Sequence, residues 1–247
     1  MKVSVCMATY NGAQYLRAQL VSILAQLGSG DEVVVVDDAS SDDTLAVLRA
    51  IGDARVSMHT NPRNLGHVQT FARALSLARN EVIFLADQDD VWLPNRLQHM
   101  LDALAASGAL VVASNFACID RDGRATAYPC HRLRAADSKR HLANLAGIFA
   151  GRRGYFGCAM ALRRGILKVA LPIPAFVESH DLWLAQIANL ARANVHLESN
   201  TLTRRIHGAN ATDLARPLWR KLWSRVGYGR SILLLTWRLT RRGARTD

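Results

Sequence analysis

Short apolar runs alternate with amphipathic segments over the first 115 residues, and this alternation constrains the fold more than any other feature. Val3–Ala8, Glu32–Val36 and Glu81–Ala86 are almost entirely apolar, as expected of strands buried on both faces. Helical spacing of apolar residues predicts helices at 11–27, 41–51, 65–78 and 94–106, and two shorter strands are predicted at 55–59 and 110–114. This order predicts a parallel sheet covered by helices on both faces.

The second half is less regular. A turn is predicted at 120–123, helices at 138–149 and 181–193, strands at 156–162, 195–197 and 202–206, and one or two basic helices over 216–242. We therefore divide the chain into residues 1–115, residues 116–214 and a tail, residues 215–247.

Charge separates the two halves of this 247-residue chain, whose net charge is +11. Residues 1–120 hold 8 Lys/Arg and 13 Asp/Glu, a net charge of −5, whereas residues 121–247 hold 23 and 7, a net charge of +16. A strongly basic protein suggests a polyanionic partner, but an acidic first half argues against a uniformly basic nucleic-acid coat.

Targeting signals and cysteine pattern indicate a cellular compartment. No apolar run approaches the roughly 20 residues that span a bilayer, and the N-terminus does not resemble a signal peptide. The four cysteines form no CxxC pair, so we expect free thiols in a reducing cytoplasm.

Polar residues follow three of the predicted strands, where ligands bind in parallel α/β sheets. They are Thr9-Tyr10-Asn11, Asp37-Asp38 and the run Asp87-Gln88-Asp89-Asp90. Helix capping or solvated turns could explain each group alone. Clustered carboxylates repel unless a cation or donor neutralises them, and oxygen ligands suit Mg²⁺ or Mn²⁺. We therefore expect a divalent cation that joins the protein to a phosphorylated substrate. No GxxxxGK[ST] loop and no GxGxxG after the first strand are present.

Four segments in this order, VSVCMATYNGAQYL, VVVVDDASSDDT, NLGHVQTFARAL and LADQDDVWLPNRL, resemble family 2 glycosyltransferases. The DQDDVW form is most similar to the bacterial polysaccharide subset, which includes rhamnosyltransferase-like members. The resemblance covers roughly residues 2–115. It implies the α/β GT-A nucleotide-diphospho-sugar transferase fold, with a mostly parallel central sheet flanked by helices and, in this chain, a basic helical C-terminal tail.

For the donor, the resemblance implies that Thr9, Tyr10 and Asn11 lie at the base pocket. Asp38 would accept a hydrogen bond from N3–H of uracil or thymine, and Asp87 would lie near the ribose. Asp89 would bind Mn²⁺ or Mg²⁺ on the diphosphate. Asp90 could support the metal site or cap a helix, and Asn64 and Gly66 match the family's turn before the third helix.

For the acceptor, the resemblance is thinner and covers about residues 154–210. Asp181 stands at the position of the catalytic base within ESHDLW, but many relatives have a Glu-Asp pair where this chain has His180-Asp181, so Glu178 or His180 could share the work. His207, in RIHGAN, could complete the metal shell or contact the diphosphate. Sugar or acceptor contacts are expected from Asp90, Gly157, Glu178, His180, Trp183 and Arg205.

The resemblance implies an inverting single displacement. A base removes the proton of an acceptor hydroxyl as that hydroxyl attacks the anomeric carbon. The donor would be a UDP- or dTDP-sugar, with dTDP-rhamnose among the candidates. The acceptor would be a glycan or a polyprenyl-diphosphate-linked sugar in bacterial surface polysaccharide synthesis.

The tail, from Arg216 to Arg245, contains nine Lys/Arg together with Trp219, Trp223 and Trp237. Basic residues and Trp on an amphipathic helix are typical of a segment at an anionic membrane surface. Packing on the chain's own domain is the alternative. The first interpretation places the protein in the cytoplasm, peripheral at the inner face of the cell membrane.

Two other function classes remain open. A nucleic-acid-binding protein would explain the basic charge but not the acidic sheet edge, so we expect no nucleic-acid partner. A sugar-phosphate nucleotidyltransferase would have a glycine-rich basic loop where this chain has TYNGAQ. Release of UDP or dTDP, rather than diphosphate, separates the two enzymes.

Overall fold

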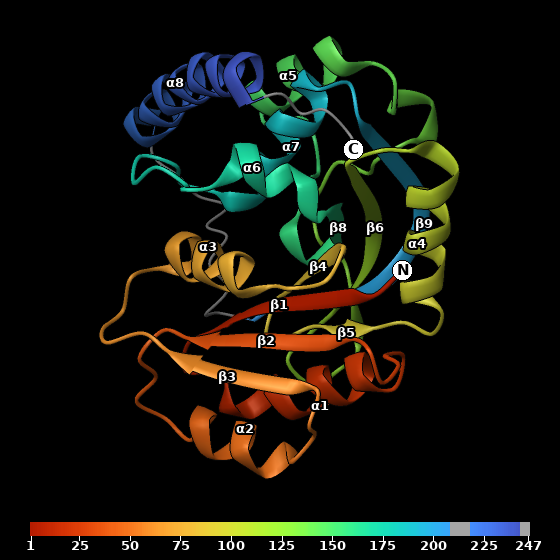
Figure 1. The fold of residues 1–247 in the computed structure, drawn as a ribbon, viewed down its shortest axis with the longest axis vertical. Coiled ribbons are helices and arrows are strands. Elements are labelled where there is room, and N and C mark those ends of the chain that lie inside the picture. Colours follow the sequence, from red (N-terminus) through yellow and green to blue (C-terminus); the bar gives the residue numbers. More distant parts are fainter. Residues whose placement is uncertain (208–217, 243–247) are drawn as a thin grey trace.

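A computed structural model describes residues 1–207 and 218–242, with side chains at 1–207 and 223–241. Within these residues one nine-stranded sheet has the order β3-β2-β1-β4-β8-β6-β9-β5, and β7 pairs with β6 (Figure 1). The strands are β1 (Val3–Thr9), β2 (Glu32–Asp37), β3 (Val56–Thr60), β4 (Val82–Ala86), β5 (Val91–Trp92), β6 (Val111–Ile119), β7 (Ala125–Thr126), β8 (Met160–Arg163) and β9 (Asn194–Arg205).

Helices cover both faces of this sheet. They are α1 (Ala13–Leu24), α2 (Thr44–Ile51), α3 (His67–Leu77), α4 (Arg96–Ser107), α5 (His141–Phe149), α6 (Leu167–Ala170), α7 (His180–Leu190) and α8 (Leu218–Arg242). Short 3₁₀ turns occupy Ala135–Asp137, Gly157–Ala159 and Arg164–Ile166. Alternate residues of a strand belong to two hydrophobic cores, one on each face of the sheet. Val5 and Met7 of β1 pack with α1 and α4, whereas Cys6 packs with α3 and α7.

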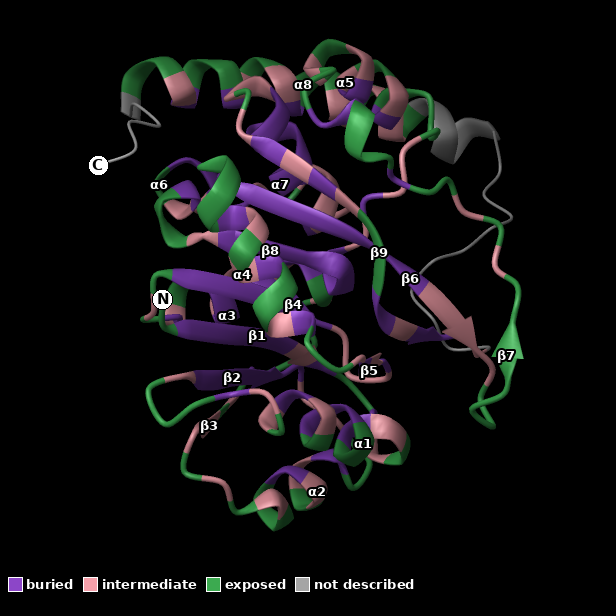
Figure 2. Cartoon of the chain, turned by 90° about the vertical axis from the view of Figure 1, so that its right-hand side faces the viewer, coloured by how far each residue is buried: buried purple, intermediate pink, exposed green. Residues whose placement is uncertain are grey.

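The parallel part of the sheet is confirmed as β3-β2-β1-β4, and each of its strands is close to the predicted range. Figure 2 shows β1, β2 and β4 buried between helices, whereas the edge strand β3 is partly exposed. The parallel register pairs Thr9 with Asp37, so the polar residues after β1, β2 and β4 meet at one edge.

Beyond β4 the sheet becomes mixed. β8 lies antiparallel between β4 and β6, and β6 runs parallel to β9. The prediction of two separate strands at 195–197 and 202–206 was wrong, because β9 is one strand whose register against β6 shifts around Asn115. β6 crosses position 115, so one sheet contains strands from both predicted halves.

α8 and α5 lie side by side at one end of the molecule (Figures 1 and 2). One face of α8 packs on α6 and α7, with Leu235 fully buried. Arg238 donates hydrogen bonds to the carbonyls of Val169, Ala170 and Pro172. Across residues 1–207 and 218–242, no helix combines the length and apolar character of a membrane span.

Candidate functional site

One cavity of about 1240 Å³ opens at the carboxyl edge of the parallel strands and extends to α8. It brings together twelve residues singled out in the sequence: Thr9, Tyr10, Asn11, Asp38, Asp87, Asp89, Gly157, Glu178, His180, Asp181, Trp183 and His207. Asn64 and Gly66 line it too. Asp90 and Arg205 are not among its lining residues; Arg205 contacts Asp89, which is, and Asp90 contacts Arg205.

Asp38 is buried, and its carboxylate holds the turn that precedes α3. Oδ1 accepts hydrogen bonds from Asn61 Nδ2 (2.7 Å) and Leu65 N (2.8 Å), and Oδ2 accepts one from Gly66 N (2.9 Å). A carboxylate has about four acceptor positions, and the three bonds from the described residues leave one of them, on Oδ2. Asp38 therefore shapes the turn beside the predicted base pocket as well as facing the cavity.

The loops after β1 and β4 are tied to each other by Gln88. Its side chain accepts a hydrogen bond from Tyr10 N (2.9 Å) and donates one to Tyr10 O (3.0 Å). On the other side, Asn11 N donates to Ser40 Oγ and Asn11 Oδ1 accepts from Ser41 N. These bonds set the three loops at the sheet edge in one arrangement, with the ring of Tyr10 half exposed.

The carboxylates of Asp87, Asp89 and Asp90 lie close to one another at this edge of the sheet. Burial first, and then the charge of Asp89, raises the pKa of Asp87 to about 7. Asp87, Asp90 and Cys158 each place a potential ligand atom within 4.8 Å of the others. Burial holds the pKa of the Cys158 thiol well above its usual range, so this sulfur stays protonated and is a poor metal ligand.

Asp89 and His207 are already in contact. His207 Nε2 donates to Asp89 Oδ2 at 2.7 Å, and the imidazole lies 5.1 Å from the ring of Tyr15. Burial and then the charge of Asp89 raise the pKa of Asp87, and Asp89 is hydrogen-bonded to the imidazole of His207. Carboxylate oxygens beside an imidazole nitrogen are a donor set that fits Mn²⁺ or Mg²⁺. Asp87, Asp89 and His207 would hold that ion, and all three line the cavity.

Asp90 and Arg205 act behind this group. Asp90 is buried and its Oδ1 accepts a hydrogen bond from Arg205 N (3.0 Å). The Arg205 guanidinium donates to the carbonyls of Asp89, Asp120 and Arg121 and stacks on Tyr15. Both residues thus fix the end of β9 against the acidic loop, residues 87–90, so that His207 faces Asp89.

Asp181 lies at the first turn of α7, whose N-cap is Ser179. Its Oδ1 accepts hydrogen bonds from Leu182 N (2.7 Å) and Ser179 Oγ, and its Oδ2 accepts one from Gly157 N (3.2 Å). Burial raises the pKa of Asp181 in spite of these bonds. The carboxylate is therefore held rigidly, and it is more basic than an ordinary aspartate.

His180 is only 5% exposed and stacks on Phe71 with ring centroids 4.0 Å apart. Neither ring nitrogen has a hydrogen-bond partner among the described residues. Burial lowers the pKa of His180 to about 3, so the ring is neutral near pH 7. A Cβ on Gly157 would lie 2.7 Å from His180 Nε2, so only glycine allows this approach.

Glu178 and Trp183 connect the cavity with α8. Glu178 Oε2 accepts a hydrogen bond from Ser224 Oγ (2.6 Å). Trp183 is fully buried, donates from Nε1 to Ala170 O (3.0 Å) and has the Arg238 guanidinium over its ring. Residues 208–210 of the closing segment lie outside the described residues.

Sequence reasoning missed Arg204, which lines the cavity from β9. Its guanidinium lies over the rings of Phe156 and Tyr128, and its positive charge interacts with the carboxylates of Asp87 and Asp90. The only sequence signal was its place beside Arg205. Sequence reasoning also did not single out Phe71, which stacks on His180 from α3.

A family model described as glycosyl transferase family 2 matches residues 4–171, more than half of the chain. The chain belongs to this family. Among curated proteins, it is 38% identical over 122 residues to the succinoglycan biosynthesis protein ExoO of Rhizobium meliloti, over 49% of this chain and 35% of that protein. It is 30% identical over 187 residues to ExoU of the same organism, covering 73% and 51%.

A third relative is the Escherichia coli UDP-Glc:alpha-D-GlcNAc-diphosphoundecaprenol beta-1,3-glucosyltransferase WfgD, 28% identical over 49% of this chain and 47% of that protein. The chain thus spans between about a third and a half of these relatives' lengths. Among solved structures, S. aureus TarS 1–349 in complex with UDP-GlcNAc matches with a TM-score of 0.71 at 18% identity, over 97% of this chain and 72% of that one. This likeness confirms the GT-A fold.

Proposed function

We propose that this glycosyltransferase moves a sugar from a nucleoside-diphosphate donor to an acceptor hydroxyl, with inversion in a single displacement. One observation supports this most: Asp181 faces the same cavity as Asp87 and Asp89, which stand at the edge where nucleotides bind in α/β sheets. A base and a cation site on one cavity are what this reaction needs.

Asp181 is the base in this proposal. Its raised pKa lets it accept a proton from the attacking hydroxyl, and Gly157 N and Leu182 N keep its oxygens in place. His180 is a poor alternative because its lowered pKa makes it weakly basic. Glu178 is hydrogen-bonded to Ser224 of α8, which gives it a tethering role.

At the donor end, Asp87, Asp89 and His207 would hold Mn²⁺ or Mg²⁺. Such an ion supplies a Lewis acid that stabilises the negative charge of the leaving diphosphate. Asp38 keeps one acceptor position on Oδ2 that suits the N3–H of uracil or thymine. We therefore propose a UDP- or dTDP-sugar as the donor, with dTDP-rhamnose among the candidates.

Acceptor and setting follow from the relatives. Succinoglycan biosynthesis and a diphosphoundecaprenol-linked acceptor appear in the names of similar proteins, so we infer a glycan or lipid-linked acceptor in polysaccharide synthesis. The outer face of α8 suits a membrane-bound substrate, because it exposes Trp223, Val226, Leu233 and Trp237. Residues 218–242 contain no acid, so we propose peripheral binding to anionic membranes.

A donor panel tests the reaction. Purified protein with Mn²⁺ or Mg²⁺ is incubated with UDP- and dTDP-sugars, and release of UDP, dTDP or diphosphate is measured. We expect nucleoside diphosphate; release of diphosphate would favour a nucleotidyltransferase. Asp181→Asn and Asp89→Ala should each lower transfer by about 100-fold or more, whereas the exposed Asp102→Asn should not. Near-normal transfer by a folded Asp181→Asn protein would refute the base assignment.

Membrane binding is tested by flotation with vesicles of phosphatidylglycerol and of phosphatidylcholine. We expect flotation with the anionic lipid only, and weaker flotation of a Trp223→Ser/Trp237→Ser variant. Equal recovery of the protein with both lipids would contradict the proposal.

A further inference from the structure

The inner edge of α8 forms a wall of the reaction cavity, far along the chain from the acidic loop. Ser224, Arg225, Gly227, Tyr228 and Ser231 line the cavity from this helix. The same cavity is also lined by the apolar side chains of Ile148, Phe176 and Val177, and Phe176 lies against Gly227. Ser224 is hydrogen-bonded to Glu178, three residues before Asp181, so this end of the cavity lies beside the proposed base, where an acceptor would bind.

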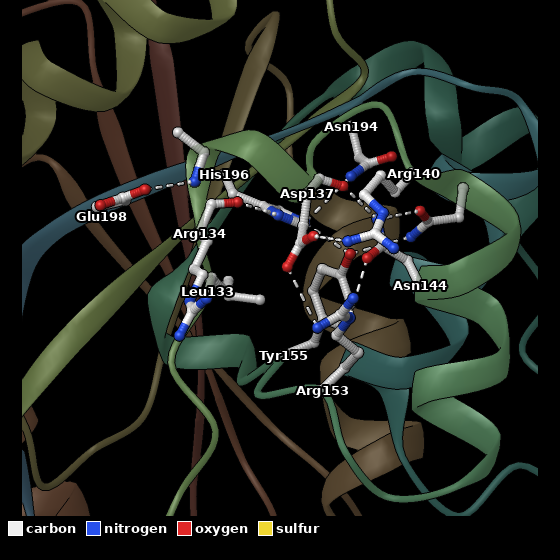
Figure 3. Close-up of polar contacts among 12 residues, drawn as sticks. Leu133, Arg134, Asp137, Arg140, Asn144, Arg153, Tyr155, Asn194, His196 and Glu198 are labelled. Atoms are coloured by element: carbon white, nitrogen blue, oxygen red, sulfur yellow. Dashed lines mark hydrogen bonds and ion pairs between the residues drawn. The ribbon is translucent and has the colours of Figure 1, made fainter.

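Two arginines, Arg153 and Arg225, line this end, and the first of them is ion-paired. Arg153 Nη1 lies 3.3 Å from Asp137 Oδ2, and its Nε donates to Asn144 Oδ1 at 3.0 Å (Figure 3). The same buried network joins Tyr155 OH to His196 Nε2 at 2.7 Å (Figure 3). Arg153 is therefore part of the scaffold of the wall.

Arg225 is different. Its guanidinium lies 5.6 Å from the ring centre of Phe149 and approaches the position of a Cβ on Gly151 to 3.9 Å. Among the described residues it forms no ion pair with a carboxylate. A cation over an aromatic face, beside an apolar wall, has hydrogen-bond donors left for an anionic group.

Gly227 leaves space in the cavity where any larger residue of α8 would place a side chain. Glycine in a helix costs about 1 kcal/mol relative to alanine, so its use inside α8 needs a reason. A Cβ there would meet Phe176 O at 3.7 Å, an ordinary contact, and any longer side chain would extend into the cavity that Gly227 lines. Gly229, two residues on, faces open space.

We infer that the α8 end of the cavity is a binding subsite for the acceptor's phosphate or diphosphate group and the apolar chain attached to it, with Arg225 as the anion contact and Gly227 as the opening. The inference rests on the proposed function, in which Asp181 receives the acceptor hydroxyl. Arg225 holds the anion, and Phe176, Val177 and Tyr228 contact the first part of the apolar chain. α8 thereby selects an amphiphilic acceptor.

Geranyl diphosphate is the probe, titrated calorimetrically into the protein with Mg²⁺ and saturating UDP, so that the nucleotide end is filled. Geraniol and inorganic pyrophosphate are titrated in parallel. We expect binding of geranyl diphosphate that is stronger than that of either fragment. Arg225→Gln and Gly227→Leu should each weaken it about tenfold or more, because one removes a charged hydrogen bond and the other fills the space. Arg49→Gln, the same charge change on α2, and Gly229→Leu, the same change on open helix, should leave it unaltered.

Equal affinity of Arg225→Gln and wild type would overturn the inference, as would equal weakening by the two control variants. If Arg225→Gln lost flotation with phosphatidylglycerol vesicles but bound geranyl diphosphate normally, the arginine would serve a membrane headgroup instead, which also overturns the inference. UDP titrated alone reports separately on the proposed function. If UDP does not bind but geranyl diphosphate binds in a way that depends on Arg225, the donor proposal is refuted and the subsite proposed here is retained.

Discussion

Gly157→Ala gives the sharpest test of how the site is packed. The added methyl would lie 2.7 Å from His180 Nε2, so about 0.7 Å of movement is needed to reach an ordinary contact of 3.4 Å. His180 has no room to retreat, because Phe71 is stacked against it and is itself buried. Overpacking of this kind costs about 1–3 kcal/mol.

The movement also reaches Asp181. Gly157 N donates to Asp181 Oδ2, and Asp181 follows His180 in the chain, so either adjustment displaces the proposed base. A displacement of about 1 Å can cost about 100-fold in rate. We expect kcat to fall by that order while UDP affinity changes less, because neither Gly157 nor His180 is a proposed nucleotide contact.

Urea unfolding, transfer kinetics and UDP titration are the measurements, with Gly165→Ala as the control because nothing lies within 4 Å of its added Cβ. The double variant Gly157→Ala/His180→Ala removes the ring that the methyl strikes. It should be more stable than the sum of the two single losses predicts, by about 1–3 kcal/mol. Additive losses, or a Gly157→Ala protein with normal stability and kcat, would refute the reasoning.

Three further predictions concern charge. The pKa of Asp181 is raised, so kcat should fall as the pH drops through a value above that of an ordinary aspartate, measured as a pH–rate profile at saturating substrates. Asp38→Asn turns an amide N–H₂ toward Gly66 N, and the unmatched donors should destabilise the fold by about 1–3 kcal/mol and weaken UDP binding, as unfolding and calorimetry would show. Burial lowers the pKa of His196 in the folded protein. Below the ordinary histidine pKa the unfolded chain therefore binds more protons than the folded protein, and the free energy of unfolding decreases as the pH is lowered. Urea unfolding at pH 7.5 and 5.5 should show a smaller loss in His196→Gln than in wild type; equal losses would contradict this assignment.

Much of the fold could be predicted because the first half obeys local rules. Valine-rich β2 and apolar β1 and β4 can only be buried strands, and the residues that follow them must meet at one edge. The placement of Asp38, Asp87, Asp89 and Asp181 on one cavity followed from the resemblance and from this topology.

The rest depends on contacts between residues far apart in the chain. Nothing local in Met160–Arg163 indicates that β8 inserts between β4 and β6, and Val91–Trp92 is too short for a period to be read. The pKa of His180 is lowered by its burial, under Phe71 among others, and then by the neighbouring His67, and a sequence pattern cannot supply these contacts. The tail's two alternatives, packing and membrane binding, use opposite faces of α8 and so do not exclude each other.

β5 pairs with β9 through only two residues, Val91 with Thr203 and Trp92 with Leu202. This short ladder, together with the bond from Arg205 N to Asp90, joins the acidic loop to the end of β9. A hybrid enzyme could be built by exchanging donor-binding halves between relatives. If the exchange point lay between residues 92 and 201, the acidic loop with β5 would come from one parent and the end of β9 from the other, so their contacts would be lost. Residues 87–92 and 201–207 should be transplanted together, even though more than a hundred residues separate them in the chain.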